Sequence, residues 1–299
     1  MKGMEIRMKS IGVITDSQCA INPIEAKRLG IRVLPMPFYV EDKCYYEDVD
    51  ITREEFFALL ADGKTVTTSQ PSPEAVMNLW REGLAEYEEI IYMPLSSGLS
   101  GSCNTARMLA EEEEFADKVY VVDNGRMATP LHRSLLDTLE LIEEGYSAKE
   151  IKDILEETKE EMVIYLGVET LEYLKRGGRI SAATAAIGTV LNIKPILKLG
   201  TGMLESYKNC RGMKKAKREM LESMKHDMEV TFKDAYEKNE IYLMAASSAD
   251  EETTKAWVAE IEEYFPGMKV LCDNLPLAIC CHTGEGALGI GCSCKPKKK

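Results

Sequence analysis

Short apolar runs, each about as long as one β-strand, recur along this chain and alternate with stretches of helical pattern. The runs richest in Ile, Val and Leu lie at 11–15, 89–95, 118–123, 162–168, 240–247 and 268–273. Strands that alternate with helices form βαβ units, and their right-handed crossovers align the strands in parallel. The pattern therefore predicts an α/β fold with mostly parallel sheets.

The chain is long enough for two ordinary domains. Its 299 residues can bury a large core, and the strand and helix series starts afresh after a long helical stretch at 129–159. We expect two α/β domains, an N-terminal one over 10–160 and a C-terminal one over 161–291. The remainder, 292–299, ends in CKPKKK and is expected to be a disordered tail.

Composition narrows the class of function. The net charge of -13 argues against nucleic acid as a partner, because phosphate contacts need a basic face. No apolar run approaches the 18 residues of a membrane span, and the first 14 residues lack a signal-peptide pattern, so we expect a cytoplasmic protein. The nine cysteines are odd in number and lack paired C-x-x-C spacing, which favours buried thiols over disulfides or zinc.

Two short segments are dense in hydroxyl side chains, TVTTSQPS at 65–72 and MPLSSGLSGS at 93–102. Ser96 and Ser97 in the second segment directly follow an apolar run, as do Asp16-Ser17 and Asp123-Asn124. Ligands of α/β sheets collect at the carboxyl ends of strands. Each segment alone is readily explained as a helix cap or a turn. Together with 67–69, before a helix start, they predict one shared crevice.

Two catalytic or cofactor-binding alternatives follow from local motifs. GLSGS at 98–102 approaches the nucleophile elbow G-x-S-x-G but ends in serine, so the competing hypothesis is a serine esterase that uses Ser97 or Ser100 with His282. GEGALG at 284–289 matches the dinucleotide fingerprint by letter, but too few residues follow it for a helix and a second strand.

The hydroxyl segments favour binding over catalysis. A hydroxyl donates one hydrogen bond, and backbone N–H groups of glycine turns add others, so such a pocket can hold a carboxylate. The apolar remainder of a ligand would need a tunnel. Residues 182–193, AATAAIGTVLNI, are one candidate lining, although their first reading is a core helix.

Eight motifs occur in the order typical of the DegV family, and the chain resembles that family from about residue 11 to residue 289. They are VITDS, TSQPS, SSGLSGS, YVVDN, LEYLKRGGRIS, KPIL, Arg211-Gly212 and HTGEGALG. The resemblance implies a two-domain α/β lipid binder with the ligand between the domains. It implies one long-chain fatty acid as ligand, no cofactor, and a bacterial fatty acid kinase subunit as partner. The protein would present the acyl group for phosphorylation without being an enzyme itself.

The same resemblance assigns roles to individual residues. Carboxylate contacts would come from Thr68 or Ser69 and Ser97, with Ser96 and His282 close by. Arg179 and Arg211 match basic positions at the phosphoryl-transfer face of the family, although a surface cation explains each almost as well. Glu285 stands where proline is common in the family, so a carboxylate near His282 could either repel an anionic ligand or orient the imidazole.

Overall fold

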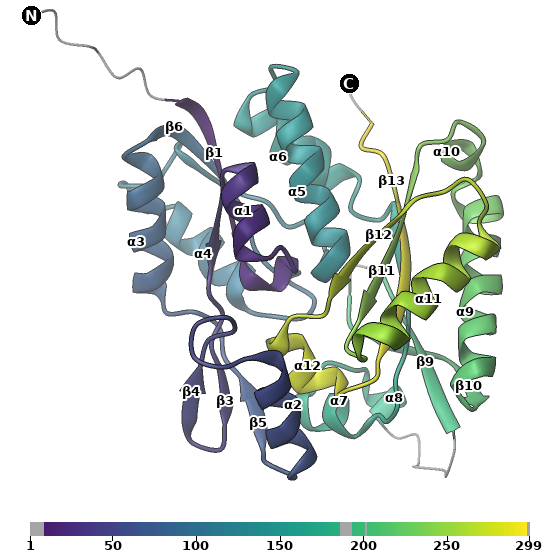
Figure 1. The fold of residues 1–299 in the computed structure, drawn as a ribbon. Helices are drawn as coiled ribbons and strands as arrows, with labels where there is room; N and C mark the ends of the chain where they lie inside the picture. The colour runs from purple at the N-terminus through teal and green to yellow at the C-terminus, as the bar shows by residue number, and fades with distance from the viewer. Residues whose placement is uncertain (1–8, 186–192, 201, 298–299) are drawn as a thin grey trace, which may run out of the picture.

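The first sheet is parallel throughout, as predicted (Figure 1). The computed structural model describes residues 9–185, 193–200 and 202–297. The strand order in this sheet is β2-β1-β6-β7. The strands are β1 (Lys9–Asp16), β2 (Ile31–Leu34), β6 (Tyr87–Met93) and β7 (Val119–Val121).

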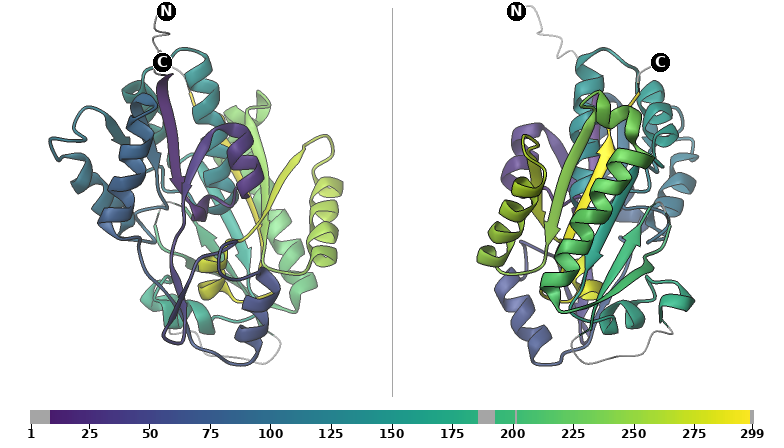
Figure 2. Two further views of the ribbon diagram at one scale, coloured as in Figure 1. Left: turned by 60° about the vertical axis from the view of Figure 1, so that its left-hand side comes forward. Right: turned by 90° about the vertical axis from the view of Figure 1, so that its right-hand side faces the viewer.

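Helices cover both faces of the first sheet (Figures 1 and 2). They are α1 (Pro23–Leu29), α3 (Pro73–Leu84), α4 (Ser102–Ala110), α5 (Ala128–Glu143) and α6 (Ala148–Glu157). On one face Trp80 packs edge-to-face against Tyr92 and Phe115, all three fully buried. The single helix predicted over 129–159 is in fact α5 and α6, because Gly145 takes a positive φ and Ser147 opens a capping box.

The second sheet corrects the prediction of mostly parallel strands. Its order is β10-β9-β8-β13-β11-β12, and only the β11–β12 pair is parallel. The strands are β8 (Met162–Gly167), β9 (Ile193–Leu199), β10 (Glu205–Arg211), β11 (Ile241–Ser247), β12 (Val270–Asn274) and β13 (Leu288–Cys294). A short connection joins β9 to β10, and this favours an antiparallel pair, whereas a parallel pair needs a long crossover.

The expectation of a disordered tail from residue 292 is also wrong. Cys292, Ser293 and Cys294 are buried in β13, which lies between β8 and β11 in the sheet. Lys295 donates its backbone N–H to the carbonyl of Glu240 at 2.7 Å. Small residues alternate with larger ones in GIGCSC, so the strand can be buried on both faces.

A third, small sheet is absent from the sequence expectation. It consists of β3 (Phe38–Val40), β4 (Lys43–Tyr45) and β5 (Val66–Thr68), with α2 (Arg53–Ala61) beside it. The apolar residues at 31–40 form one run in the sequence, but prolines at 35 and 37 divide it, so β2 joins the first sheet and β3 the small one.

The remaining elements belong mainly to the second half of the chain. They are η1 (Ser17–Cys19), α7 (Glu172–Gly177), α8 (Ala182–Ala185), α9 (Met213–His226), η2 (Asp227–Thr231), α10 (Lys233–Glu237), α11 (Glu251–Tyr264) and α12 (Leu277–Thr283). Helices α9 and α11 cover one face of the second sheet. The predicted boundary near residue 160 falls between α6 and β8. Most of the helix predicted over 181–192 lies outside the described residues.

One hydrophobic core joins the small sheet to the second sheet. Phe38 and Phe56 from the first half of the chain share it with Leu166, Leu174 and Leu277 from the second half. Helix α5 also connects the halves, since the Thr129 hydroxyl donates to the carbonyl of Ala245 at 2.8 Å. Residues 38–68 therefore pack against elements that follow them by more than 100 positions.

Candidate functional site

A part-buried pocket lies where the small sheet, the loop after β6, α7 and α12 meet. Its apolar wall includes Met36, Leu95, Leu99, Leu174, Leu204 and Ile279. Its polar residues are Gln18, Thr68, Ser69, Gln70, Ser100, Arg179, His282 and Thr283. The accessible volume is about 70 Å³. The pocket thus combines an apolar wall with a few polar groups, as small-molecule sites commonly do.

The pocket adjoins a second, smaller space in the interior. That chamber measures about 20 Å³ and shares Met127 and Leu204 with the pocket. Ile164, Leu166 and Ile290 of the second sheet are among its lining residues. The predicted lining at 182–193 lies mostly outside the described residues. In the described part of the chain, Met127 and Leu204 are thus the shared wall between the pocket and an apolar chamber beside the second sheet.

Thr68 and His282 meet in the pocket. The Thr68 hydroxyl lies 2.9 Å from Nε2 of His282, at hydrogen-bonding distance. Thr68 ends β5, and His282 stands near the end of α12. The start of α12 is fixed to the small-sheet region, since the Leu277 N–H donates to Oε2 of Glu47 at 2.8 Å. These contacts bring two sequence-predicted site residues together.

His282 is neutral at physiological pH. Burial lowers its pKa to about 4, and the positive charge of Arg179 acts in the same direction. Its Nδ1 is buried and has no hydrogen-bond partner among the described residues. A neutral imidazole has one donor and one acceptor nitrogen, and Nε2 is the nitrogen that faces Thr68, whereas Nδ1 packs against Gly177.

Gly177 makes room for the imidazole. A Cβ added at this position would overlap the His282 ring at Nδ1 and Cε1. Gly177 ends α7, immediately before the left-handed Gly178. The glycine pair of KRGGR therefore serves as the expected helix end and also allows close packing against His282.

Arg179 lies in the pocket wall, two residues beyond Gly177. Its Nε donates to the Leu99 carbonyl at 3.3 Å, and its Nη1 donates to the Gly177 carbonyl. Arg211 does not lie beside Arg179 and is not among the described pocket residues. The Arg179 carbonyl accepts from the Leu204 N–H, just before β10, whereas Arg211 is the last residue of that strand. At roughly 3.3 Å per residue, the two backbone positions are about 20 Å apart.

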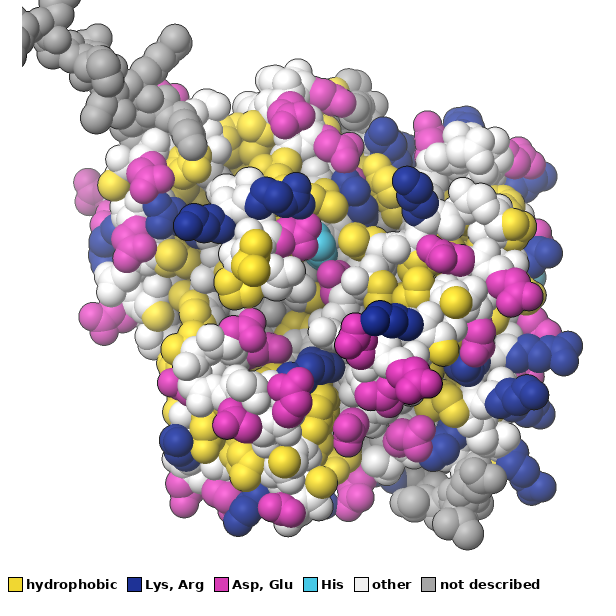
Figure 3. All heavy atoms as spheres, in the orientation of Figure 1, with side chains coloured by type: hydrophobic (Ala, Val, Ile, Leu, Met, Phe, Trp, Pro, Cys, Tyr) yellow, Lys and Arg dark blue, Asp and Glu magenta, His cyan; other side chains and the backbone are white. Residues whose placement is uncertain are grey.

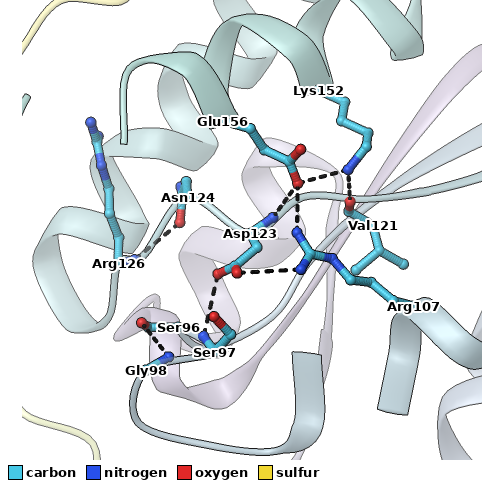
Figure 4. A network of polar contacts seen from close by, with 10 residues as sticks. All are labelled: Ser96, Ser97, Gly98, Arg107, Val121, Asp123, Asn124, Arg126, Lys152 and Glu156. Atoms are coloured by element: carbon cyan, nitrogen blue, oxygen red, sulfur yellow. Dashed lines mark hydrogen bonds and ion pairs between the residues drawn. The ribbon is translucent and has the colours of Figure 1, made fainter. Parts of the chain in front are cut away.

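Buried carboxylates hold the loop after β6. The Leu95 N–H donates to Oδ2 of Asp16 at 2.8 Å, and the Ser97 N–H donates to Oδ1 of Asp123 at 3.3 Å. Asp123 forms an ion pair with Arg107, and both residues contact the carboxylate of Glu156 (Figure 4). The predicted crevice segments at 16–17 and 123–124 thus support the loop, and the described pocket lining does not include them.

The three loop serines differ in position. The Ser96 hydroxyl is buried and accepts from the Gly98 N–H at 3.2 Å (Figure 4). Neither Ser96 nor Ser97 is among the described lining residues, whereas Ser100 is. Ser100 is separated from Ser96 and Ser97 by one turn of backbone, in which the Ser100 N–H donates to the Ser96 carbonyl at 3.1 Å. The family motifs pointed to Ser97 as a ligand contact with Ser96 close by, whereas the serine of this loop in the described lining is Ser100.

The geometry gives no support to the esterase hypothesis. Ser97 is not among the described lining residues, and the hydroxyl nearest to His282 Nε2 is that of Thr68. Nδ1 of His282 has no carboxylate partner among the described residues to orient the ring, as a catalytic triad requires. The 284–289 motif leads into strand β13 instead of a helix, which excludes the dinucleotide fingerprint.

Two features of the surroundings bear on ligand charge. Glu285 is exposed and lines a different cleft, with Asp250 and Glu251, so it does not face the pocket. A larger open cleft of about 1230 Å³ includes Glu47, Asp48 and Asp50 in its lining. Acidic side chains also mark the face shown in Figure 3. An anionic ligand is therefore disfavoured in the open acidic cleft and favoured in the pocket beside Arg179.

No metal-binding group of three or more His, Cys, Asp or Glu residues occurs in the described part of the chain. Among the described helices, none is long and apolar enough to cross a membrane. The nine cysteines are all free thiols. Burial raises the pKa of Cys280 to about 12, so this thiol stays protonated at neutral pH.

The fold and pocket define an α/β protein with two larger sheets and one small sheet, and with a pocket of mixed polar and apolar lining where the two halves of the chain meet. Comparison with known proteins identifies the family. The DegV family model matches residues 10–295. A DegV domain-containing protein of Caldanaerobacter subterraneus subsp. tengcongensis is 33% identical over 219 residues, which cover 73% of this chain and 78% of that one. The chain belongs to the DegV family.

Solved structures agree with this assignment. A fatty-acid-binding DegV family protein of Thermus thermophilus is 33% identical, with a TM-score of 0.83 over 95% of this chain and 99% of that chain. DegV of Bacillus subtilis, described as a fatty acid binding protein, is 28% identical, with a TM-score of 0.80 over 97% and 100%. The α/β fold and the family resemblance inferred from the sequence motifs are confirmed.

Proposed function

We propose that this protein binds one long-chain fatty acid, with its carboxylate at the polar side of the pocket and its acyl chain directed toward the interior chamber. The observation that carries the proposal is the Thr68–His282 pair beside Arg179, at the edge of an apolar pocket. The fatty-acid-binding relatives from Thermus thermophilus and Bacillus subtilis support it.

In this proposal, the head group is held by a small set of donors. Thr68, Ser69 and Ser100 offer hydroxyls, and Arg179 supplies a positive charge. Hydrogen bonds to a charged group contribute about 1.5–3 kcal/mol each. Neutral His282 donates from Nε2 to the Thr68 oxygen, which leaves the Thr68 O–H free to donate to the carboxylate. Ser96 and Ser97 act indirectly, because they shape the turn that presents Ser100.

The acyl chain supplies the larger share of the affinity. Each buried methylene contributes about 0.8 kcal/mol. The described pocket and chamber, about 70 and 20 Å³, are smaller than the roughly 300–1,000 Å³ of typical ligand pockets. Binding therefore requires side chains to move apart, most directly at Met127 and Leu204, where the two spaces meet.

The finer part of the proposal is presentation to a bacterial fatty acid kinase subunit in the cytoplasm. Arg179 lies beside the proposed carboxylate and could stabilise a phosphate that forms on it. Arg211 is exposed, next to the basic start of α9, where Lys214 and Lys215 follow. Cationic side chains gather over α9 at the right-hand margin of Figure 3. This surface suits an acidic partner.

Native mass spectrometry of the purified protein tests the binding proposal. We expect the folded chain to carry one additional mass equal to a long-chain fatty acid, and solvent extraction to release that acid. The Thr68→Val variant, purified from the same cells, should carry less of it. A protein that is empty as purified and takes up neither palmitate nor oleate would contradict the proposal.

A further inference from the structure

Gln18 is a buried side-chain amide in the wall of the pocket. Its side chain is almost fully buried, with 1% of the residue exposed. Neither Oε1 nor Nε2 has a hydrogen-bond partner among the residues that the structure describes. Buried amides are normally paired, because an unpaired one loses its hydration without compensation. Gln18 therefore needs a polar group that the described chain does not supply.

The backbone around Gln18 is fixed. Its N–H donates to Oδ1 of Asp16 at 3.0 Å, and the other oxygen of Asp16 accepts from Leu95. The hydroxyl of the preceding Ser17 accepts from the Met36 N–H at 3.0 Å. Leu95 and Met36, which both line the pocket, are thereby held next to Gln18. The amide faces an apolar wall whose position is set by the end of β1.

Gln18 is more buried than the groups proposed to hold the carboxylate, and the other buried polar residue of the lining, Thr283, already donates its hydroxyl to backbone carbonyls at the end of α12. Ser69 is exposed, and Thr68, Arg179 and His282 are intermediate in exposure, whereas Gln18 is buried. If the carboxylate binds among the more exposed groups, as proposed above, then the acyl chain passes Gln18. A plain hydrocarbon chain cannot form a hydrogen bond with an amide, so it would leave both atoms unpaired.

The chemistry of the amide selects the missing group. The amide donates through Nε2 and accepts through Oε1, whereas a carboxylate only accepts. A hydroxyl group does both. We propose that Gln18 recognises a hydroxyl on the acyl chain, so that the pocket prefers hydroxylated long-chain fatty acids over unsubstituted ones. This specificity rests on the proposed function, because it requires the acyl chain to occupy the pocket.

Gln70 provides a matched control in the same pocket. It also lines the pocket, but it is exposed, and its Oε1 already accepts from the Thr105 hydroxyl at 3.2 Å. Replacing Gln70 removes an amide of the same size without removing a buried, unpaired one. An effect specific to Gln18 is therefore separable from a general loss of polarity at the pocket.

Calorimetric titration of the delipidated full-length protein tests the inference. The ligands are palmitate, 2-hydroxypalmitate, 3-hydroxypalmitate, stearate and 12-hydroxystearate, and the proteins are wild type, Gln18→Leu, Gln18→Met and Gln70→Leu. We expect the wild type to bind at least one hydroxy acid about five- to tenfold more tightly than its parent acid. Both Gln18 variants should lose this preference and bind palmitate at least as tightly as the wild type. Gln70→Leu should retain the preference.

The outcomes separate the inference from the proposed function. A wild type that binds palmitate but prefers no hydroxy acid overturns the role of Gln18 alone. Equal weakening of all ligands in both Gln18 variants assigns the amide to the carboxylate and also overturns it. A wild type that binds none of the five acids overturns the proposed function itself. Two variants are used because Leu and Met differ in shape, and thermal unfolding of each checks that it folds.

Discussion

The hydroxyl of Thr68 lies 2.9 Å from Nε2 of His282, although 214 positions separate the two residues in the chain. Thr68 comes from the small sheet, which packs against the second half of the molecule, and His282 from α12. The pair thus connects β5, which belongs to the hydroxyl-rich segment 65–72, with helix α12.

Replacing Thr68 with valine should weaken fatty acid binding. The substitution keeps the shape of the side chain and removes one hydroxyl donor to a carboxylate, a hydrogen bond of about 1.5–3 kcal/mol, so we expect a tenfold to hundredfold lower affinity by calorimetry. Thr67→Val is the matched control, because Thr67 is exposed and is not among the described pocket residues. Equal affinities for the two variants would remove Thr68 from the head-group site.

Gly177→Ala should displace the His282 ring. The new Cβ would overlap the ring at Nδ1, so the ring or α7 must shift, at a cost of about 1–3 kcal/mol as for other overpacked positions. We expect a lower melting temperature and weaker binding. Gly200→Ala is the control, since its Cβ would meet no atom within 4 Å. A variant with unchanged stability and affinity would show that the ring does not pack as described.

The titration of His282 should respond to ligand. Its pKa is lowered to about 4 by burial and by Arg179, so the folded protein binds this proton only at low pH. The unfolded chain binds it near pH 6.5, and this residue therefore reduces stability as pH falls from about 6.5 toward 4. A bound carboxylate should raise the pKa again. Proton NMR of the imidazole, assigned with His282→Gln, should show an upward shift with palmitate. A titration midpoint that ligand leaves unchanged would place the carboxylate elsewhere.

Arg211→Ala should separate transfer from binding. Arg211 is exposed at the end of β10 and lies about 20 Å along that strand from the position of Arg179. We expect unchanged palmitate affinity and reduced acyl phosphate formation when a fatty acid kinase subunit and ATP are supplied. Arg28→Ala, on α1, is an exposed control. Loss of palmitate binding in Arg211→Ala, with normal phosphorylation of what remains bound, would assign the arginine to the ligand pocket.

The first sheet could be predicted from sequence because its strands are continuous apolar runs between clear helix signals. The mostly antiparallel second sheet could not be predicted, because strand direction depends on which strand edges pair. In the sequence alone, the end of β13 resembles a cysteine-rich tail, and only its pairing with β8 and β11 shows that it is a central strand. The small sheet could not be predicted, because β3 continues the apolar run at 31–40, where only the two prolines indicate a division, and β4 and β5 are only three residues long.

The site was predictable at the level of segments. Motif order indicated Thr68, Ser69 and His282, and spacing after strands indicated the serine loop; all three residues and Ser100 of the loop line the pocket. Which serine faces the pocket depends on one turn of backbone, and sequence does not fix that turn. Gln18 could not have been found, because a glutamine after a strand is ordinarily exposed, and only its burial without a partner makes it informative.

A crystal structure of the delipidated protein with added palmitate tests the account most directly. We expect the carboxylate within hydrogen-bonding distance of the Thr68 hydroxyl and beside His282 and Arg179, with the acyl chain passing Met127 and Leu204 toward the second sheet. Palmitate bound instead in the open acidic cleft near Glu47, or with its carboxylate at Arg211, would contradict the account.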